Sequence, residues 1–382
     1  MYKTILYMLL FLPVLQLKAG GNKPINRGAK EDSLTQRQIL GAMGPFPYEL
    51  PPEKTKEQLL EEAYIEKHKE ASVISQFFKD RDLLLSLNTL GYQRVFPGLG
   101  FAENQEDNAS ITNGLQKSIQ EYLQIGNQQM VANLQNRLGI CYVGSKQYDK
   151  AIACFLNALS IKRELKDFDG AIQVSRNLAT LYKFRGNKED ADQYYRLMYK
   201  MASDYRDLNA QAYAMEQLAL LKADKGYYLE AQLDLIKKIL PLYKRAKNVS
   251  GRINAYNNLA FVYAMEKKYT ESRWFYLQAI KVATKGGDAR DLAYSLYYLA
   301  GIKRRLEEYQ LAINDYRAAA SYASKTRDKP LKMRIYDELG DIYIRTKDYD
   351  GASASLKEYK TIRASLNLDK LHGEWAFVQL GE

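Results

Sequence analysis

One leucine recurs along most of this chain at a nearly constant spacing, and this repeat constrains the fold more than any other feature. Successive positions lie 40, 40, 41, 40 and 40 residues apart, glycine or alanine follows each leucine directly, and a large side chain stands seventeen residues after it. A fixed period of this length indicates a repeat architecture, in which each unit packs on its neighbours. The six ladder positions are Leu138, Leu178, Leu218, Leu259, Leu299 and Leu339.

Each repeat is predicted to be a hairpin of two helices. The leucine, the small residue after it and the residue four positions on lie near one face of a helix. A small residue at +13 and a large one at +17 lie one turn apart on a second helix, and a turn such as Arg185-Gly186-Asn187 separates the two helices. Eleven residues before every ladder leucine stands Asn or Asp, whose side chains accept hydrogen bonds from the free N–H groups of a first helical turn. These predicted caps are Asn127, Asp167, Asp207, Asn248, Asp288 and Asp328.

The repeat resembles that of the tetratricopeptide-repeat family. The shared pattern is leucine, a small residue and tyrosine, as in Asn258-Leu-Ala-Phe-Val-Tyr263, followed by tyrosine and a small residue, as in Tyr148-Asp-Lys-Ala151. The usual repeat has about 34 residues, so the longer period here is similar to the repeats of kinesin light chain and of several bacterial signalling regulators. The resemblance covers residues 127–366 and implies an all-α fold, a right-handed α-solenoid of antiparallel helical hairpins. HEAT repeats share the longer period but lack this register of small and aromatic residues.

The first 19 residues (1–19) have the features of a signal peptide. Lys3 supplies an N-terminal positive charge, an uncharged apolar run follows, and Ala19 is a small residue at the expected cut. The run is shorter than the roughly 20 residues that a membrane-spanning helix needs, although an uncleaved anchor remains the alternative. We therefore expect a bacterial protein that is exported to the periplasm, the cell surface or the medium, with no integral membrane span after cleavage.

Two segments at the ends of the chain are expected to lie outside the folded repeats or to cover them. Residues 20–52 are polar and then rich in glycine and proline, which is typical of a flexible linker. Residues 367–382 follow the last repeat and are expected to cap it, because the terminal hairpin of a solenoid otherwise leaves an apolar face bare.

Residues 53–126 are expected to hold N-terminal helices with a degenerate repeat. Residues 112–126 continue the register backwards and are predicted to be the second helix of an incomplete seventh hairpin. Its first helix is expected within residues 72–92, where several leucines and phenylalanines occur. Residues 54–69 are predicted to form a charged amphipathic helix.

Charge and cysteine usage limit the classes of function. The chain has 56 basic and 45 acidic residues, a formal net charge of +11, which fits an acidic partner, an anionic surface or simply a solvated surface with excess lysine. The sequence has no cluster of basic residues interleaved with aromatics, which is the pattern that would indicate nucleic-acid binding. Cys141 and Cys154 are too few for a disulfide framework; we expect buried free thiols, with a bridge between them as the alternative.

The sequence contains no recognisable catalytic or cofactor site. Its two histidines, His68 and His372, are far apart, so neither metal-ligand spacing nor a histidine-based nucleophile arrangement is present. A phosphate-binding G-x-x-x-x-G-K-[ST] loop is absent as well. We therefore expect a protein that is not an enzyme and needs no metal or cofactor.

The family resemblance also implies where a partner would bind. In that family the first helices line a concave groove, through residues at set positions on either side of the ladder leucine. Side-chain amides can bond to a peptide backbone, and tyrosines give rigid apolar contact with a polar tip. Carried over by position, the predicted peptide groove consists of Asn133, Asn136, Arg176, Asn177, Lys183, Tyr213, Asn254, Asn257, Asn258, Phe261, Tyr294 and Tyr297. Four arginines would form an anion pocket toward the last two repeats, namely Arg304, Arg305, Arg334 and Arg345.

These features predict an exported scaffold that binds a protein or peptide in its concave groove, and the basic charge favours an acidic partner. Two alternatives remain open. One is a sensor or regulatory module of an envelope signalling system that acts in trans. The other is a solute- or glycan-binding protein with a closed pocket.

Overall fold

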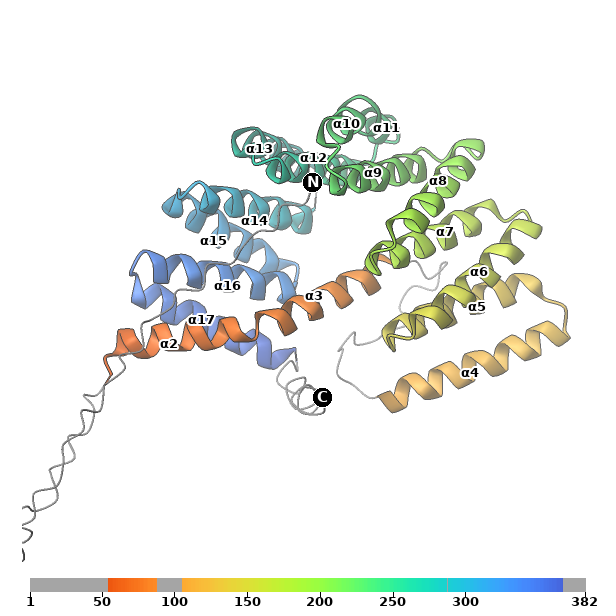
Figure 1. Cartoon of the computed structure of the whole chain (residues 1–382), viewed down its shortest axis with the longest axis horizontal. Helices are drawn as coiled ribbons and strands as arrows, with labels where there is room; N and C mark the ends of the chain where they lie inside the picture. Colours follow the sequence, from red (N-terminus) through yellow and green to blue (C-terminus); the bar gives the residue numbers. More distant parts are fainter. Residues whose placement is uncertain (1–53, 88–104, 287, 367–382) are drawn as a thin grey trace, which may run out of the picture. The chain divides into compact units, whose positions relative to one another are not determined.

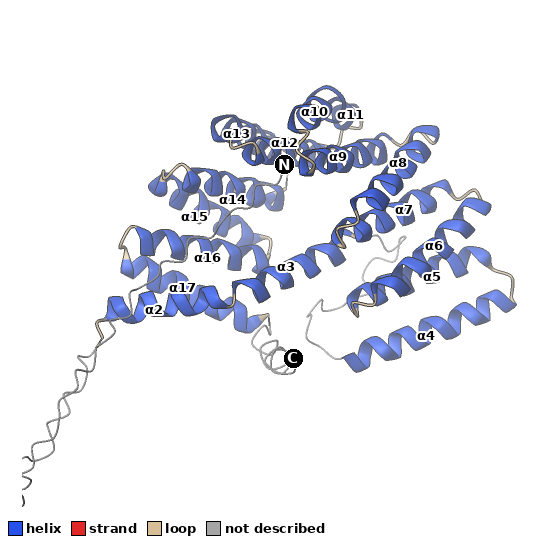
Figure 2. Cartoon of the chain, in the orientation of Figure 1, coloured by secondary structure: helices blue, strands red, loops and turns tan. Residues whose placement is uncertain are grey.

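The chain folds into helical hairpins that follow one another in sequence order (Figure 1). The computed structural model describes residues 54–87, 105–286 and 288–366, and all regular structure in these residues is helical (Figure 2). The helices belong to one compact unit. This arrangement confirms the predicted all-α fold of tandem antiparallel hairpins. None of the helices in the described residues combines the length and apolar character of a membrane span.

The first helix of every predicted repeat has 17 residues and begins directly after its Asn or Asp cap. The cap side chain accepts a hydrogen bond from the first turn in each case, as where the N–H of Met130 donates to Asn127 at 3.1 Å. The predicted caps are therefore confirmed. The first helices are α5 (Gln128–Gly144), α7 (Phe168–Phe184), α9 (Leu208–Asp224), α12 (Val249–Met265), α14 (Ala289–Arg305) and α16 (Lys329–Arg345).

The second helices complete the hairpins, which we number one to six in chain order. Five of them are continuous, whereas that of hairpin three contains a π-helical turn. They are α6 (Tyr148–Glu164), α8 (Lys188–Asp204), α10 (Tyr228–Asp234) with η1 (Leu235–Ile239) and α11 (Leu240–Arg245), α13 (Tyr269–Gly286), α15 (Tyr309–Lys325) and α17 (Tyr349–Ser365).

The π turn explains the one irregular step of the leucine ladder. Asn248 stands 13 positions after Leu235, whereas Asp167 stands 12 positions after Phe155 in hairpin one. A single-turn π-bulge takes up one extra residue inside an α-helix. Hairpin three therefore absorbs the insertion within its second helix and keeps the next cap in register.

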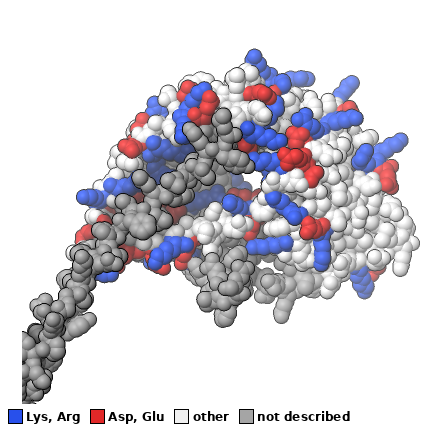
Figure 3. Space-filling model, in the orientation of Figure 1, with Lys and Arg blue, Asp and Glu red and all other residues white. Residues whose placement is uncertain are grey.

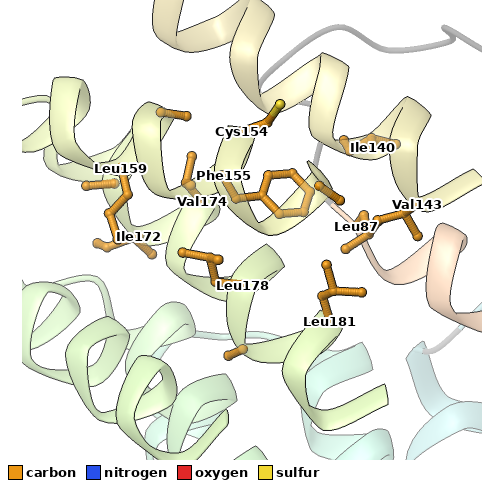
Figure 4. Packing of buried hydrophobic residues seen from close by; sticks show 14 of the residues in the cluster. Leu87, Ile140, Val143, Cys154, Phe155, Leu159, Ile172, Val174, Leu178 and Leu181 are labelled. Carbon is orange, nitrogen blue, oxygen red and sulfur yellow. The ribbon is translucent and has the colours of Figure 1, made fainter. Parts of the chain in front are cut away.

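Small and large residues meet inside each hairpin as their spacing predicts. Gly139 lies against the ring of Phe155, where an added Cβ would come within 2.6 Å of a ring carbon. Around this contact, side chains from α5, α6 and α7 form one cluster of buried residues (Figure 4). Leu87, which follows α3 (Ala71–Ser86), is buried in the same cluster beside Val143.

The helices before the repeats differ in part from the expected arrangement. Helix α4 (Gln105–Gln124) packs on α5 in the way that the second helix of each hairpin packs on the first helix of the next. Its residues Leu115 and Ile119 are buried. Helix α3 does not form the expected hairpin with α4, because it lies against α5 and α7. Helix α2 (Lys56–Lys69) forms where a charged helix is predicted, and it packs on α17. The predicted signal peptide, linker and C-terminal cap lie outside the described residues.

Candidate partner-binding surface

The predicted groove residues all lie on first helices, and α9, α12, α14 and α16 contact one another in succession. We call the surface that carries these residues the first-helix face. Polar and aromatic side chains of neighbouring hairpins contact one another on this face. The surroundings of each side chain therefore depend on the neighbouring repeat.

Basic side chains in hairpin two reach to hairpin three. The guanidinium of Arg176 lies 4.3 Å from the ring centroid of Tyr213, a cation–π geometry. The ammonium group of Lys183 donates to Gln217 at 3.1 Å. Burial lowers the pKa of Lys183, because a low-dielectric environment disfavours the charged form.

Glu216 is a buried carboxyl on this face, with a side chain exposed by only 3%. It accepts hydrogen bonds from the hydroxyl of Tyr243 and the amide of Asn258, both at 2.9 Å. Desolvation raises the pKa of Glu216 to about 7, and the two hydrogen bonds oppose that shift. The predicted groove residue Asn258 is thus held by a neighbouring hairpin.

Three predicted groove asparagines are buried between first helices. Asn177 donates its amide to Asn136 at 2.9 Å, and both side chains are fully buried. Asn257 donates to the hydroxyl of Ser295 at 3.1 Å and is 8% exposed. These amides connect one hairpin to the next. Asn133 is partly buried, with a side-chain oxygen that has no hydrogen-bond partner.

Among the predicted groove residues, the exposed ones lie on α12. Asn254 is exposed, and Phe261 is exposed by 48%, although it is a large apolar residue. On α14, Tyr294 donates to Asp328 at 3.2 Å, and the ring of Tyr297 lies 5.8 Å from that of Tyr316. The half-exposed ring of Phe261 can supply apolar contact to a partner.

The four predicted anion-pocket arginines have different surroundings. Arg304 pairs with Glu338 at 3.0 Å, and Arg334 donates to Asp82 at 3.0 Å. Arg305 and Arg345 are exposed at the last positions of α14 and α16. Arg334 and Arg345 are 11 residues apart on one helix, so their backbones are about 16 Å apart at 1.5 Å per residue. The anion pocket stays a prediction.

Sequence reasoning did not find that α2 and α3 lie on hairpin six. Lys67 pairs with Asp337 at 2.6 Å and with Asp341 at 3.0 Å. The guanidinium carbon of Arg334 lies 3.9 Å from the centroid of the Phe78 ring. These partners are about 250 to 275 positions apart in sequence and lie outside the repeat register, so no periodic signal connects them.

The two cysteines of the chain both lie in the described residues. Cys141 and Cys154 are buried free thiols, so the alternative of a bridge is not realised. Burial raises the pKa of Cys154 to about 11. No group of three or more His, Cys, Asp or Glu side chains in the described part could hold a metal ion.

Lys and Arg are interspersed with Asp and Glu over the face that Figure 3 shows.

Comparisons with known proteins agree with the hairpin architecture. A family model described as tetratricopeptide repeat matches residues 130–204, 251–320 and 291–365. No curated protein matches the chain.

Among solved structures, aspartyl phosphate phosphatase F from Bacillus subtilis aligns with a TM-score of 0.48 and 13% identity over 86% of each chain. BtubC from P. vanneervenii aligns with a TM-score of 0.41 and 16% identity over 68% of this chain and 92% of its own. A putative kinesin light chain from Podosopora anserina aligns with a TM-score of 0.41 and 17% identity over 51% of this chain and 95% of its own. With its six capped hairpins and its matches to the family model, the chain belongs to the tetratricopeptide-repeat family.

Proposed function

We propose that this chain is an exported scaffold that holds a protein or peptide partner on its first-helix face. The observation that carries the proposal is the stripe of Asn254, Asn258 and Phe261 on α12, in which an exposed amide and a half-exposed ring stand two turns apart. Residues spaced by four and then three positions share one side of a helix. An amide can bond to a partner backbone while the ring supplies apolar contact.

Binding can be tested by affinity capture from an envelope fraction with quantitative mass spectrometry. We expect the double variant Asn254→Ala, Phe261→Ser to capture at least tenfold less of the partner than the unchanged chain captures. Leu229→Ser is the matched control, because Leu229 is 68% exposed but lies on the second helix α10. Equal enrichment by the unchanged chain and the double variant would refute the proposal.

Export is part of the proposal and has its own test. The features that support it are Lys3, the apolar run and the small residue Ala19. We expect intact-mass analysis of protein from the native cells to give a chain that begins after residue 19, in the envelope or the medium. A full-length chain found only in the cytosol would contradict export and would leave the partner-binding proposal standing.

A further inference from the structure

Helices α2 and α3 cover hairpin six and then extend to the first hairpins. Tyr64 of α2 donates its hydroxyl to the carbonyl of Ala352 at 2.9 Å and lies against Gly340. Farther along, Ile74, Phe77 and Phe78 are buried in a cluster with residues of α16 and α17.

At the centre of this contact, one arginine binds both an aromatic ring and a carboxylate of the same helix. Arg334 donates to Asp82 at 3.0 Å, and its guanidinium stacks over the ring of Phe78. Phe78 and Asp82 are four residues apart, so they lie on the same side of α3. Arg334 is one of the predicted anion-pocket arginines and lies on the first helix α16, so α3 covers part of the surface where that pocket is predicted.

The contact is not closely filled. A cleft of about 300 Å³ that is open to solvent lies between α2–α3 and hairpins five and six. Its walls include Ile74, Phe78, Tyr297, Arg334 and Tyr359. Because the cleft is open, part of the apolar surface of its walls stays in contact with water and not with α3.

Two carboxylates of the contact are open to water, although Lys67 also pairs with the less exposed Asp341. The side chain of Asp82 is 53% exposed, and that of Asp337, which pairs with Lys67, is 43% exposed. Ion pairs with such open carboxylates contribute little to stability, because water screens them. A helix with the same charges that also fills the cleft would bury apolar surface that α3 leaves in contact with water.

We propose that the surface of hairpins five and six under α3 is a binding site for an amphipathic helix that carries an aromatic residue and, one turn later, a carboxylate. Helix α3 is the occupant of this site in the structure, and a partner helix replaces it. The inference rests on the proposed scaffold function and specifies the chemistry of the partner. It assigns Arg334 as the residue that recognises the aromatic–carboxylate pair.

The test uses the full chain and a fluorescein-labelled synthetic peptide with the α3 sequence, residues 71–87. A tethered segment has an effective concentration in the millimolar range, so the chain's own α3 competes strongly with the free peptide. Asp82→Arg in the chain weakens the internal contact and leaves the peptide unchanged. We expect this variant to bind the peptide at least tenfold more tightly than the unchanged chain in fluorescence anisotropy titrations.

Two controls separate the site from general charge effects. Glu121→Arg makes the same charge change at an exposed position on α4 and should leave the affinity for the peptide unchanged. Adding Arg334→Glu to the Asp82→Arg chain should remove the gain, and a peptide with Phe78→Ala should bind at least tenfold more weakly. Thermal melts followed by circular dichroism verify that each variant is folded.

The outcomes distinguish the two proposals. If the Asp82→Arg chain binds the peptide no better than the Glu121→Arg chain, or if the Arg334→Glu variant retains full binding, the helix site is refuted. The affinity capture through Asn254 and Phe261 would be untouched by that result. Equal capture by the unchanged chain and by the Asn254→Ala, Phe261→Ser variant, with peptide binding intact, would instead refute the scaffold proposal at α12 and keep the helix site.

Discussion

At the scale of single residues, variation in the repeat is compensated within the same hairpin. In hairpin two, Tyr182 at +4 stacks on Tyr194 at +16 with ring centroids 5.5 Å apart. In hairpin five a lysine replaces the tyrosine, and Lys303 pairs with Asp315 at 2.5 Å. Between these two hairpins the two positions change together, from an aromatic stack to an ion pair. The other hairpins with these combinations contain the stack Tyr263–Phe275 and the pair Lys222–Asp234.

This compensation predicts a coupled response to mutation. Asp315→Ala should lower the free energy of unfolding by about 1–3 kcal/mol, because Lys303 is only 16% exposed and would lose its partner. The double change Lys303→Tyr, Asp315→Phe copies hairpin four and should recover most of that loss. Chemical denaturation of the single and double variants measures both values. A double variant as unstable as Asp315→Ala would contradict the pairing.

The buried carboxyl of Glu216 predicts a pH dependence. Its pKa is raised in the folded state from 4.5 to about 7, so folding favours the protonated form. Its stabilising contribution is complete below pH 4.5 and is lost as the pH rises to about 7, at a cost of up to roughly 3 kcal/mol. Glu216→Gln should therefore reduce the fall in stability between pH 5 and 8. Glu121→Gln, at an exposed site, is the control, and denaturant titrations at each pH provide the measurement.

At the scale of elements, helix ends are defined by local backbone chemistry. Each first helix begins at an Asn or Asp cap, and the hairpin turns use residues with positive φ. Glycine occupies such a position at Gly186 and Gly226, whereas lysine does so at Lys146 and Lys347. Because only glycine adopts this conformation without a Cβ clash, the turns tolerate a small local strain at the lysines.

The turn conformation predicts opposite effects of one substitution at two places. Gly226→Ala should destabilise the chain by about 1 kcal/mol, because φ at this residue is +89°. Gly114→Ala should instead stabilise by up to about 1 kcal/mol, since Gly114 lies inside α4 with nothing within 4 Å of an added Cβ. Thermal unfolding of both variants tests the pair. A stabilised Gly226→Ala variant would show that the turn geometry is wrong.

At the scale of the whole molecule, residues outside the repeats join hairpins that are distant in sequence. Helix α2 lies on hairpin six, and the end of α3 contributes Leu83 and Leu87 to the core of the first hairpins. Along α3, Asp80 also pairs with Lys146 of hairpin one at 3.3 Å. Contacts in a repeat array are otherwise confined to neighbouring units. The α2–α3 segment therefore adds long-range cooperativity that the repeats alone do not have.

The close approach of α2 to hairpin six predicts a local effect on exchange. Gly340→Ala should loosen α2 and α3, because an added Cβ would lie 2.0 Å from the hydroxyl oxygen of Tyr64, at a cost of about 1–3 kcal/mol. Hydrogen–deuterium exchange should then rise in α2 and α3 more than in the hairpins. Gly301→Ala is the matched control, since its nearest atom would be 3.7 Å away. Unchanged exchange in α2 would contradict the contact.

Helix positions that local sequence signals encode could be predicted, whereas contacts between residues far apart in the sequence could not. The caps and the ladder located the first helices because a capping residue acts on the turn that follows it. The burial of Asn136 and Asn177 could not be predicted, since it depends on how neighbouring hairpins approach each other. The position of α3 was also missed, because the pair Arg334–Asp82 spans 252 residues and belongs to no period.

The central claim is that a partner binds on the first-helix face, and site-specific photo-crosslinking in the native cells tests it most directly. A photoreactive residue at Phe261 on α12 is compared with one at Leu229 on α10, both of which are exposed. We predict a discrete crosslinked partner from position 261, absent from position 229 and lost when Asn254→Ala is added. The same adducts from both positions, or adducts from 229 alone, would contradict the account.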